Sequence, residues 1–217
     1  MQSIAIGDAA QDDILALSMS GGGVISLNGL ANVTSAGNGN DHLLLSAAAN
    51  HVFSLPQLST AVRLRTSLTG VGAGVNAPNL TSLTQSVINL GAGQFFNGGT
   101  QIANLDHSTI NVTGGAVFSG VTATSYRSDA SYLGLWSGAT LFGADGAGSA
   151  VRLPTIQTFT FGSGNGDNNY YVSVANGGQV DLSGLRSLSI FNGEDDDLYF
   201  GVAASGGLIC LLYTSPS

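Results

Sequence analysis

Carboxylate and amide side chains recur in short glycine-rich segments, and their oxygens are the ligands that a calcium ion prefers. The acidic candidates in these segments are Asp41, Asp167, Asp195, Asp196 and Asp197. Aspartate, asparagine and glycine also favour tight turns, because short polar side chains hydrogen-bond to the nearby backbone and glycine accepts positive φ. We expect turns at these segments and assign no metal-binding residue, with calcium coordination as the alternative.

Small hydroxyl side chains recur nine residues after the start of each sequence repeat described below. This row comprises Thr34, Val62, Thr84, Thr109, Ser125, Thr160 and Ser189. A companion row two residues earlier comprises Asn32, Thr60, Ser82, His107, Ala123, Thr158 and Ser187. Residues two apart share one face of a strand, so both rows would form an outward ladder. Such a face could bind ice or a glycan, although threonine and serine also suit solvent-facing strands without any ligand.

Two acid–histidine pairs are the nearest approach to a catalytic dyad. Asp41-His42 and Asp106-His107 are sequence neighbours, so in a strand their side chains would point to opposite faces. The chain contains no nucleophile-elbow, zinc-protease or phosphate-loop motif. We therefore assign no catalytic residue and no cofactor-binding residue.

A polysaccharide lyase or hydrolase would need clustered acids with a basic residue on one face. Arg152 or Arg186 near Asp181 is the only grouping that could begin such a site. We expect a protein without enzymatic activity, and a polysaccharide-active enzyme is the alternative.

Several aromatic residues could either stack on sugars or pack inside the fold. They are Tyr126, Tyr132, Trp136, Phe142, Tyr170, Tyr171, Tyr199 and Phe200. We expect them to stack on one another in the interior.

The composition favours sheets and turns over helices. Of 217 residues, 43% are hydrophobic, only 8% are charged and 32 are glycine, while the five basic residues are all arginine. The net charge of −8 excludes a basic stripe for nucleic acid. No apolar stretch is long enough to span a membrane as a helix. The single cysteine, Cys210, excludes an internal disulfide framework.

An internal repeat has the pattern G-G-x-φ-x-φ-x-x-φ-x-x-φ, where φ is apolar. It is clearest at 22–33 and 177–188, and weaker copies lie between them. The first φ of each copy stands at Ile25, Phe53, Val75, Thr100, Ala116, Val151, Val180 and Ile209, with Ala116 the least regular.

The repeat predicts an all-β, parallel β-helix, a β-solenoid with three faces and about seven to eight coils of roughly 22 to 29 residues, with little or no helix. Each φ-x-φ is a short strand with one face inward, and the x-x that follows is a corner. A leucine-rich repeat is the alternative because L-x-x-L recurs, but its return segments are not usually so rich in glycine and asparagine. A two-sheet sandwich fits the sequence less well than either.

The two ends suggest a piece of a longer protein. Ser3–Ile6 already resembles the middle of a coil, so we expect a solenoid that is uncapped at both ends. We assign residues 1–210 to a single solenoid domain and 211–217 to a non-repeat tail. The tail, LLYTSPS, resembles translated sequencing-adapter sequence and is then not biological.

The repeat pattern resembles the coils of large secreted parallel β-helix proteins of bacteria, which include adhesins, autotransporter passengers and pectin-lyase-like enzymes. Separately, Gly37–Leu43 is similar to one calcium-binding nonapeptide of the repeats-in-toxin type, with Ala36 in place of the first glycine. The first resemblance implies an extracellular rod at the cell surface that serves as a stalk or adhesin and contacts carbohydrate. We expect no nucleic-acid partner, and we expect further coils or end-to-end stacking.

Overall fold

The computed structural model describes residues 2–7, 12–35, 40–128, 139–162, 168–190 and 196–211. Within these ranges the chain forms twenty-two β-strands and no helix, which confirms the all-β prediction. It follows that no helix of the described ranges could cross a membrane. The strands pair in parallel throughout five sheets.

The largest sheet has eight strands, which lie in chain order. They are β2 (Ile14–Met19), β4 (His42–Ala47), β7 (Leu64–Leu68), β10 (Val87–Leu90), β12 (Thr109–Thr113), β15 (Ala139–Asp145), β18 (Asn169–Ala175) and β21 (Asp197–Ala203). Because both neighbours of each inner strand come from other parts of the chain, the sheet depends on contacts between distant residues.

The other four sheets fall into two groups. The first group holds β5 (Val52–Ser54), β8 (Gly74–Asn76) and β11 (Phe95–Asn97) in one sheet, and β13 (Val117–Phe118), β16 (Ala150–Arg152), β19 (Gln179–Leu182) and β22 (Leu208–Leu211) in another. The second group holds β1 (Ser3–Ile6), β3 (Asn32–Ser35), β6 (Thr60–Val62) and β9 (Ser82–Thr84) in one sheet, and β14 (Ser125–Ser128), β17 (Thr158–Phe161) and β20 (Ser187–Ile190) in another. Leu211, which we assigned to the tail, therefore ends β22, and residues 212–217 lie outside the described ranges.

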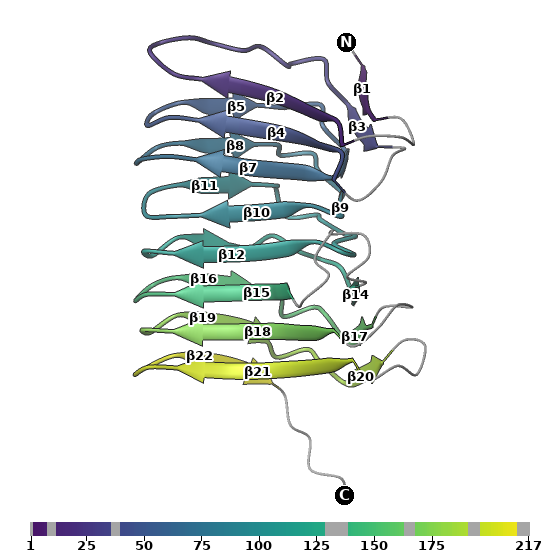
Figure 1. Cartoon of the computed structure of the whole chain (residues 1–217), viewed down its shortest axis with the longest axis vertical. Coiled ribbons are helices and arrows are strands. Elements are labelled where there is room, and N and C mark those ends of the chain that lie inside the picture. The colour runs from purple at the N-terminus through teal and green to yellow at the C-terminus, as the bar shows by residue number, and fades with distance from the viewer. Residues whose placement is uncertain are drawn as a thin grey trace, which may run out of the picture.

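The chain winds repeatedly through these groups. Five strands of the eight-stranded sheet are each followed by one strand of each other group, as in β4–β5–β6 and β18–β19–β20, whereas β2 is followed only by β3 and β10 only by β11. We call each strand of the eight-stranded sheet, together with the chain that follows it up to the next such strand, a winding. Figure 1 shows the windings stacked along the long axis, with the eight-stranded sheet toward the viewer. Equivalent residues of successive windings therefore form columns of hydrogen-bonded neighbours.

The strand register confirms five of the predicted repeat starts. Phe53 pairs with Val75, Val151 pairs with Val180, and Val180 pairs with Ile209. These residues therefore form two in-register rows, one in each sheet of the first group, and within each row the repeat pattern predicted the partners.

Two predicted repeat starts are wrong. Phe96 rather than Thr100, and Phe118 rather than Ala116, pair with the confirmed starts. The error at Thr100 arose because the glycine pair 98–99 follows a strand, where the repeat pattern assumes that it precedes one. Glycine serves a turn at either end of a strand, so the pair alone does not fix the register.

The corner after each φ-x-φ is a turn closed by a backbone hydrogen bond across three residues. The N–H groups of Leu30, Leu58, Leu80, Ile156 and Leu185 donate to the carbonyls of Leu27, Leu55, Ala77, Leu153 and Leu182, at 2.9 to 3.2 Å. The first winding makes this turn although Ile25 lies outside a strand. Its corner geometry therefore matches that of the clearest repeat, at Val180.

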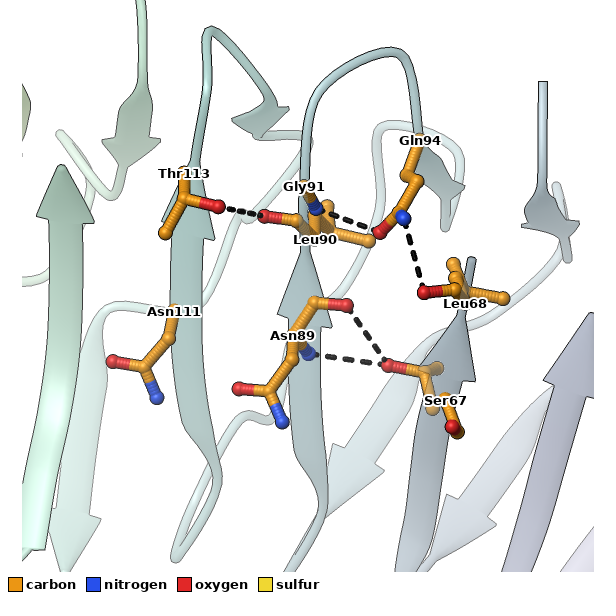
Figure 2. Close-up of a pocket in the computed structure, with 9 residues that line it drawn as sticks. Ser67, Leu68, Asn89, Leu90, Gly91, Gln94, Asn111 and Thr113 are labelled. Atoms are coloured by element: carbon orange, nitrogen blue, oxygen red, sulfur yellow. Dashed lines mark hydrogen bonds between the residues drawn. The ribbon is translucent and has the colours of Figure 1, made fainter. Parts of the chain in front are cut away.

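Side chains replace part of the backbone ladder between β7 and β10 (Figure 2). The described register of these two strands consists of one pair, Arg65 with Val87. Beyond it, Thr66 Oγ1 accepts a hydrogen bond from the Asn89 N–H at 3.1 Å. Gln94 accepts from the Gly91 N–H at 2.7 Å and donates to the Leu68 carbonyl at 3.0 Å. The two strands are thus splayed where each ends, and Gln94 bridges them.

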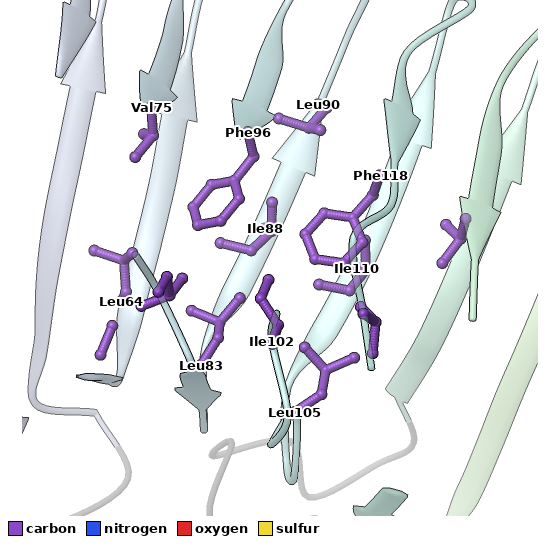
Figure 3. Packing of buried hydrophobic residues seen from close by; sticks show 14 of the residues in the cluster. Leu64, Val75, Leu83, Ile88, Leu90, Phe96, Ile102, Leu105, Ile110 and Phe118 are labelled. Carbon is purple, nitrogen blue, oxygen red and sulfur yellow. The ribbon is translucent and has the colours of Figure 1, made fainter. Parts of the chain in front are cut away.

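The inward side chains of all windings form one hydrophobic core. In the middle windings aliphatic residues such as Leu64, Ile88 and Ile110 fill it, and Phe96 and Phe118 stack beside them at 6.0 Å between ring centroids (Figure 3). In the later windings several aromatic rings pack together in the core. There Tyr126 packs against Phe142 and Phe159, with centroids 4.8 and 4.9 Å away. The prediction that aromatic residues stack inside is confirmed for Tyr126, Phe142 and Tyr170, all of which are buried.

Candidate functional site

The acidic corners make backbone caps between windings. Asp41 is fully buried, and its Oδ1 accepts a hydrogen bond from the Asp13 N–H at 2.7 Å. Asp196 repeats this arrangement, with its Oδ1 2.8 Å from the Asn168 N–H. Each carboxylate caps the start of the strand in the preceding winding, 28 residues away in the sequence, whereas the turn role that we expected would bond it to nearby backbone.

The remaining calcium candidates divide in two. Asp197 is exposed and accepts a hydrogen bond from Tyr199 Oη at 2.9 Å. Asp167, Asp195 and residues 36–39 of the nonapeptide-like segment lie outside the described ranges. Among the residues that the structure does describe, no three His, Cys, Asp or Glu side chains come together as a metal-binding group.

The predicted hydroxyl ladder is correct in part. Asn32, Thr60 and Ser82 pair in one row, and Thr158 pairs with Ser187. Thr34 and Thr84 lie on β3 and β9 of the same sheet, and Thr160 pairs with Ser189.

The predicted hydroxyl ladder is wrong at the positions that were counted from the misplaced repeat starts Thr100 and Ala116. Thr109 belongs to the eight-stranded sheet and is buried, while His107 lies in a turn with φ of 59°. Ser125 pairs with Thr158 rather than Thr160, and the partner of Thr160 is Arg127. Val62 and Arg127 interrupt the hydroxyl row, so it is less regular than the sequence predicted.

Neither acid–histidine pair forms a dyad. His42 Nδ1 contacts the Asn40 carbonyl at 2.5 Å, and burial lowers the pKa of this imidazole. Asp106 Oδ1 accepts from the Arg127 N–H at 2.8 Å. Both acids thus bond to backbone, as side chains in capping positions do.

The proposed nucleus of an enzyme site lies on a different sheet from the main groove described next. Arg152 and Asp181 are neighbours in register on β16 and β19, and Asp181 Oδ1 accepts from the Ser183 N–H at 2.9 Å. Arg186 is exposed in the segment before β20. This grouping offers one carboxylate, whereas most glycosidases use two.

A groove runs across the outer face of the eight-stranded sheet. Three hollows form it, with volumes of about 210, 390 and 220 Å³. Ser67 lines the first two, and both Asn111 and Thr113 line the last two. The shared residues place the three hollows next to one another along this face; we call the three together the groove, part of which Figure 2 shows.

Small and uncharged side chains make the floor of this groove. Two in-register rows supply it from strands of the eight-stranded sheet: one holds Ser18, Ser46 and Ser67, and the other holds Asn89, Asn111, Gly143 and Ser173. Gly143 lies under the Asn111 side chain, since a Cβ at this position would stand 2.4 Å from Asn111 Oδ1. The floor therefore presents hydroxyl and amide groups, which both donate and accept hydrogen bonds.

Two tyrosines border the groove at its β18 end. Tyr171 and Tyr199 pair in register and stack, with ring centroids 5.3 Å apart and planes 18° apart. They are 38% and 44% exposed, so the expectation that they pack inside is wrong. Tyr171 stands two residues before Ser173 on β18, on the same outward face.

Sequence reasoning missed this site for a definable reason. The strands that follow the acidic corners are recognisably apolar in the sequence. Their outward residues form a groove only when the same position is compared from one winding to the next, and the repeat pattern does not make that comparison. In Tyr170–Ala175 every second side chain is buried, so Tyr170 points inward and Tyr171 points outward. That alternation is the signal that could have separated the two tyrosines.

The chain matches no protein-family model, and neither curated proteins nor solved structures give a significant match. The groove and the strand register therefore carry the functional inference.

Proposed function

We propose that the five sheets are the three faces of one parallel β-helix of eight coils, and that this β-helix binds a glycan without cleaving it. The eight-stranded sheet would be one face, and each pair of shorter sheets would be another. The repeated order of strands along the chain and the in-register columns support this arrangement.

The observation that carries the binding function is the row of adjoining hollows with a stacked tyrosine pair at its edge. Hydroxyl and amide groups can exchange hydrogen bonds with sugar hydroxyls, and aromatic faces can cover the apolar face of a sugar ring. Asp145 is the one charged residue among the described lining residues, and its Oδ1 already accepts from Asn176 Nδ2 at 2.7 Å. A groove of this kind suits an uncharged, hydroxyl-rich chain lying along the stack.

In this proposal the protein is a stalk or adhesin-like segment at the cell surface, and its partner is a carbohydrate. The low-charge surface rich in serine, threonine and asparagine supports an extracellular rod. Ice binding receives less support, because Val62 and Arg127 interrupt the hydroxyl rows.

Binding to a panel of soluble glycans, including dextran, xylan and chitooligosaccharides, tests the proposal by calorimetry. We expect Tyr171→Ala and Tyr199→Ala each to weaken binding by about tenfold, since a lost aromatic contact of about 1.4 kcal/mol has that effect. Phe95→Ala is the matched control, because Phe95 is an exposed aromatic residue on β11, in another sheet.

Two results would count against the proposal. Binding that resists both tyrosine substitutions would place the glycan elsewhere, and a panel without any bound glycan would remove the function. Shortening of a bound polysaccharide during the experiment would show the enzymatic alternative instead.

A further inference from the structure

Arg65 stands on the outer face of β7, beside the groove. It lies two residues before Ser67, which lines the groove, so both side chains leave the same face of the strand. Its neighbours in the column are Leu44 on β4 and Val87 on β10. The guanidinium thus leaves the sheet between two aliphatic side chains, and Arg65 is half-buried.

No carboxylate of the residues that the structure describes accompanies the Arg65 charge. Arg65 makes no hydrogen bond or ion pair with any residue of the described ranges. The charge that acts on it is Arg63, whose Nε donates to Gln85 Oε1 at 2.8 Å and whose Nη1 donates to Ser35 Oγ at 3.1 Å. Burial first, and then the Arg63 charge, lower the pKa of Arg65.

This placement is unusual for a chain with thirteen acidic residues and five arginines. Acidic side chains are plentiful in the sequence, yet the half-buried Arg65 beside the groove has none as a partner within the described ranges, and Arg63 adds a second positive charge that acts on it. An anion beside Arg65 would supply acceptors for its guanidinium donors and would offset the repulsion from the Arg63 charge.

We propose that Arg65 binds an oxyanion carried by the glycan, such as a carboxylate or a sulfate group, and that the positive charge of Arg63 adds to the attraction. This inference rests on the proposed glycan-binding function and names the chemical class of the ligand. The uncharged floor contacts the sugar hydroxyls, and Arg65 selects chains that bear an acidic substituent at one position.

The geometry also sets where that substituent must lie. Arg65 and Tyr171 each stand two residues before a floor residue, and four strand steps separate β7 from β18. At about 4.8 Å per step the two sites are roughly 19 Å apart. A chain of several sugars can therefore reach the tyrosine pair and Arg65 together, whereas a single sugar cannot.

Dextran, carboxymethyl dextran and dextran sulfate test the inference, because they share one backbone and differ in charge. We expect the wild-type protein to bind the two acidic forms about tenfold more tightly than dextran, as one charge-assisted hydrogen bond would give. Arg65→Gln should remove this preference and leave dextran binding unchanged. Arg65→Lys should keep part of it, because lysine retains the charge but not the fork of donors.

Arg186→Gln is the matched control, since it removes the same charge from an exposed position outside the groove. An equal loss in Arg65→Gln and Arg186→Gln would show general electrostatics and overturn the inference. Equal binding of all three dextrans by the wild-type protein would overturn it too, while leaving the glycan-binding function in place. Absence of binding to every form would remove both.

Inorganic sulfate separates a site for the anion alone from one that needs the sugar. Millimolar sulfate should raise the melting temperature of the wild-type protein more than that of Arg65→Gln if the guanidinium binds the anion itself. An equal rise in both proteins would reflect the general stabilising effect of sulfate and would contradict direct binding at Arg65.

Discussion

Gln94 shows how one side chain can stand in for backbone pairing. Its amide satisfies the Gly91 N–H and the Leu68 carbonyl, which would otherwise face each other across the splayed strands β7 and β10. An unsatisfied polar group in a half-buried position costs free energy, so the amide stabilises the floor of the groove as well as the sheet.

We expect Gln94→Ala to lower the free energy of unfolding by about 1 to 3 kcal/mol, because it leaves two backbone groups without these partners. Thermal unfolding followed by circular dichroism measures this. The control is Gln101→Ala, since Gln101 is exposed and its amide is 3.5 Å from the Pro78 carbonyl. Similar stability of both variants would show that Gln94 is dispensable.

Tyr126 predicts a dependence of stability on alkaline pH. Burial raises the pKa of its hydroxyl, which donates to the Ser108 carbonyl at 2.8 Å. In the unfolded chain a tyrosine ionises near pH 10. Above that pH the unfolded state loses this proton and the folded state keeps it, so stability falls as the pH rises.

We expect the free energy of unfolding of the wild-type protein to fall between pH 10 and 11 by up to about 1.4 kcal/mol more than that of Tyr126→Phe. Urea unfolding at the two pH values measures the difference. Identical slopes for the two proteins would mean that the hydroxyl ionises equally in both states.

The acidic corners stabilise the starts of strands. Asp41 and Asp196 each cap a strand of the preceding winding, which leaves those oxygens engaged with backbone N–H groups. We therefore expect calcium to leave the thermal midpoint unchanged, and Asp41→Ala to lower the free energy of unfolding by about 1 to 3 kcal/mol. A midpoint that rises with added calcium would reassign these corners to metal binding.

The sequence predicted the strands where glycine pairs, apolar alternation and corners agree, as at Val151, Val180 and Ile209. It failed where a glycine pair follows a strand, and the error at Thr100 carried over to the ladder position counted from it. At Gly99 the φ is 71° and a Cβ would stand 2.3 Å from the Pro78 carbonyl, so this glycine serves contact between windings. Such a demand depends on the neighbouring winding and has no local signal.

The groove was harder to predict than the strands. Its floor depends on how Ser67, Asn89 and Asn111 lie beside one another on three strands. Between β7 and β10 the Thr66 side chain replaces a backbone hydrogen bond, and no repeat in the sequence indicates that replacement. Arg65 likewise becomes notable only when its neighbours on other strands are known. A repeat pattern can place strands, but outward contacts require the aligned stack.

The molecule as a whole is stabilised by each winding lying against its neighbours. Val174 and Val202 are partners in register on β18 and β21, yet Val174 is fully buried while Val202 is 56% exposed. The same residue type in one column therefore differs in burial because, among the described residues, windings lie on both sides of Val174 and on one side of Val202.

We expect Val174→Ala to lower the free energy of unfolding by about 2 kcal/mol, from lost burial and the cavity left behind. Val202→Ala should cost less than about 0.5 kcal/mol, as an exposed position usually does. Chemical denaturation of both variants measures the two changes in the free energy of unfolding. Equal costs would contradict nearest-neighbour stacking as the source of stability.

Because the seven strands from β2 to β18 each add one residue to the floor of the groove, the length of the ligand that fits is set by how many times the chain passes through this part of the sheet. Duplication of one internal pass would lengthen the recognised chain by about 4.8 Å while the chemistry of each step stayed the same. Loss of a pass between β7 and β18 would instead bring Arg65 closer to the tyrosine pair and change which spacing of acidic groups along a polymer is preferred.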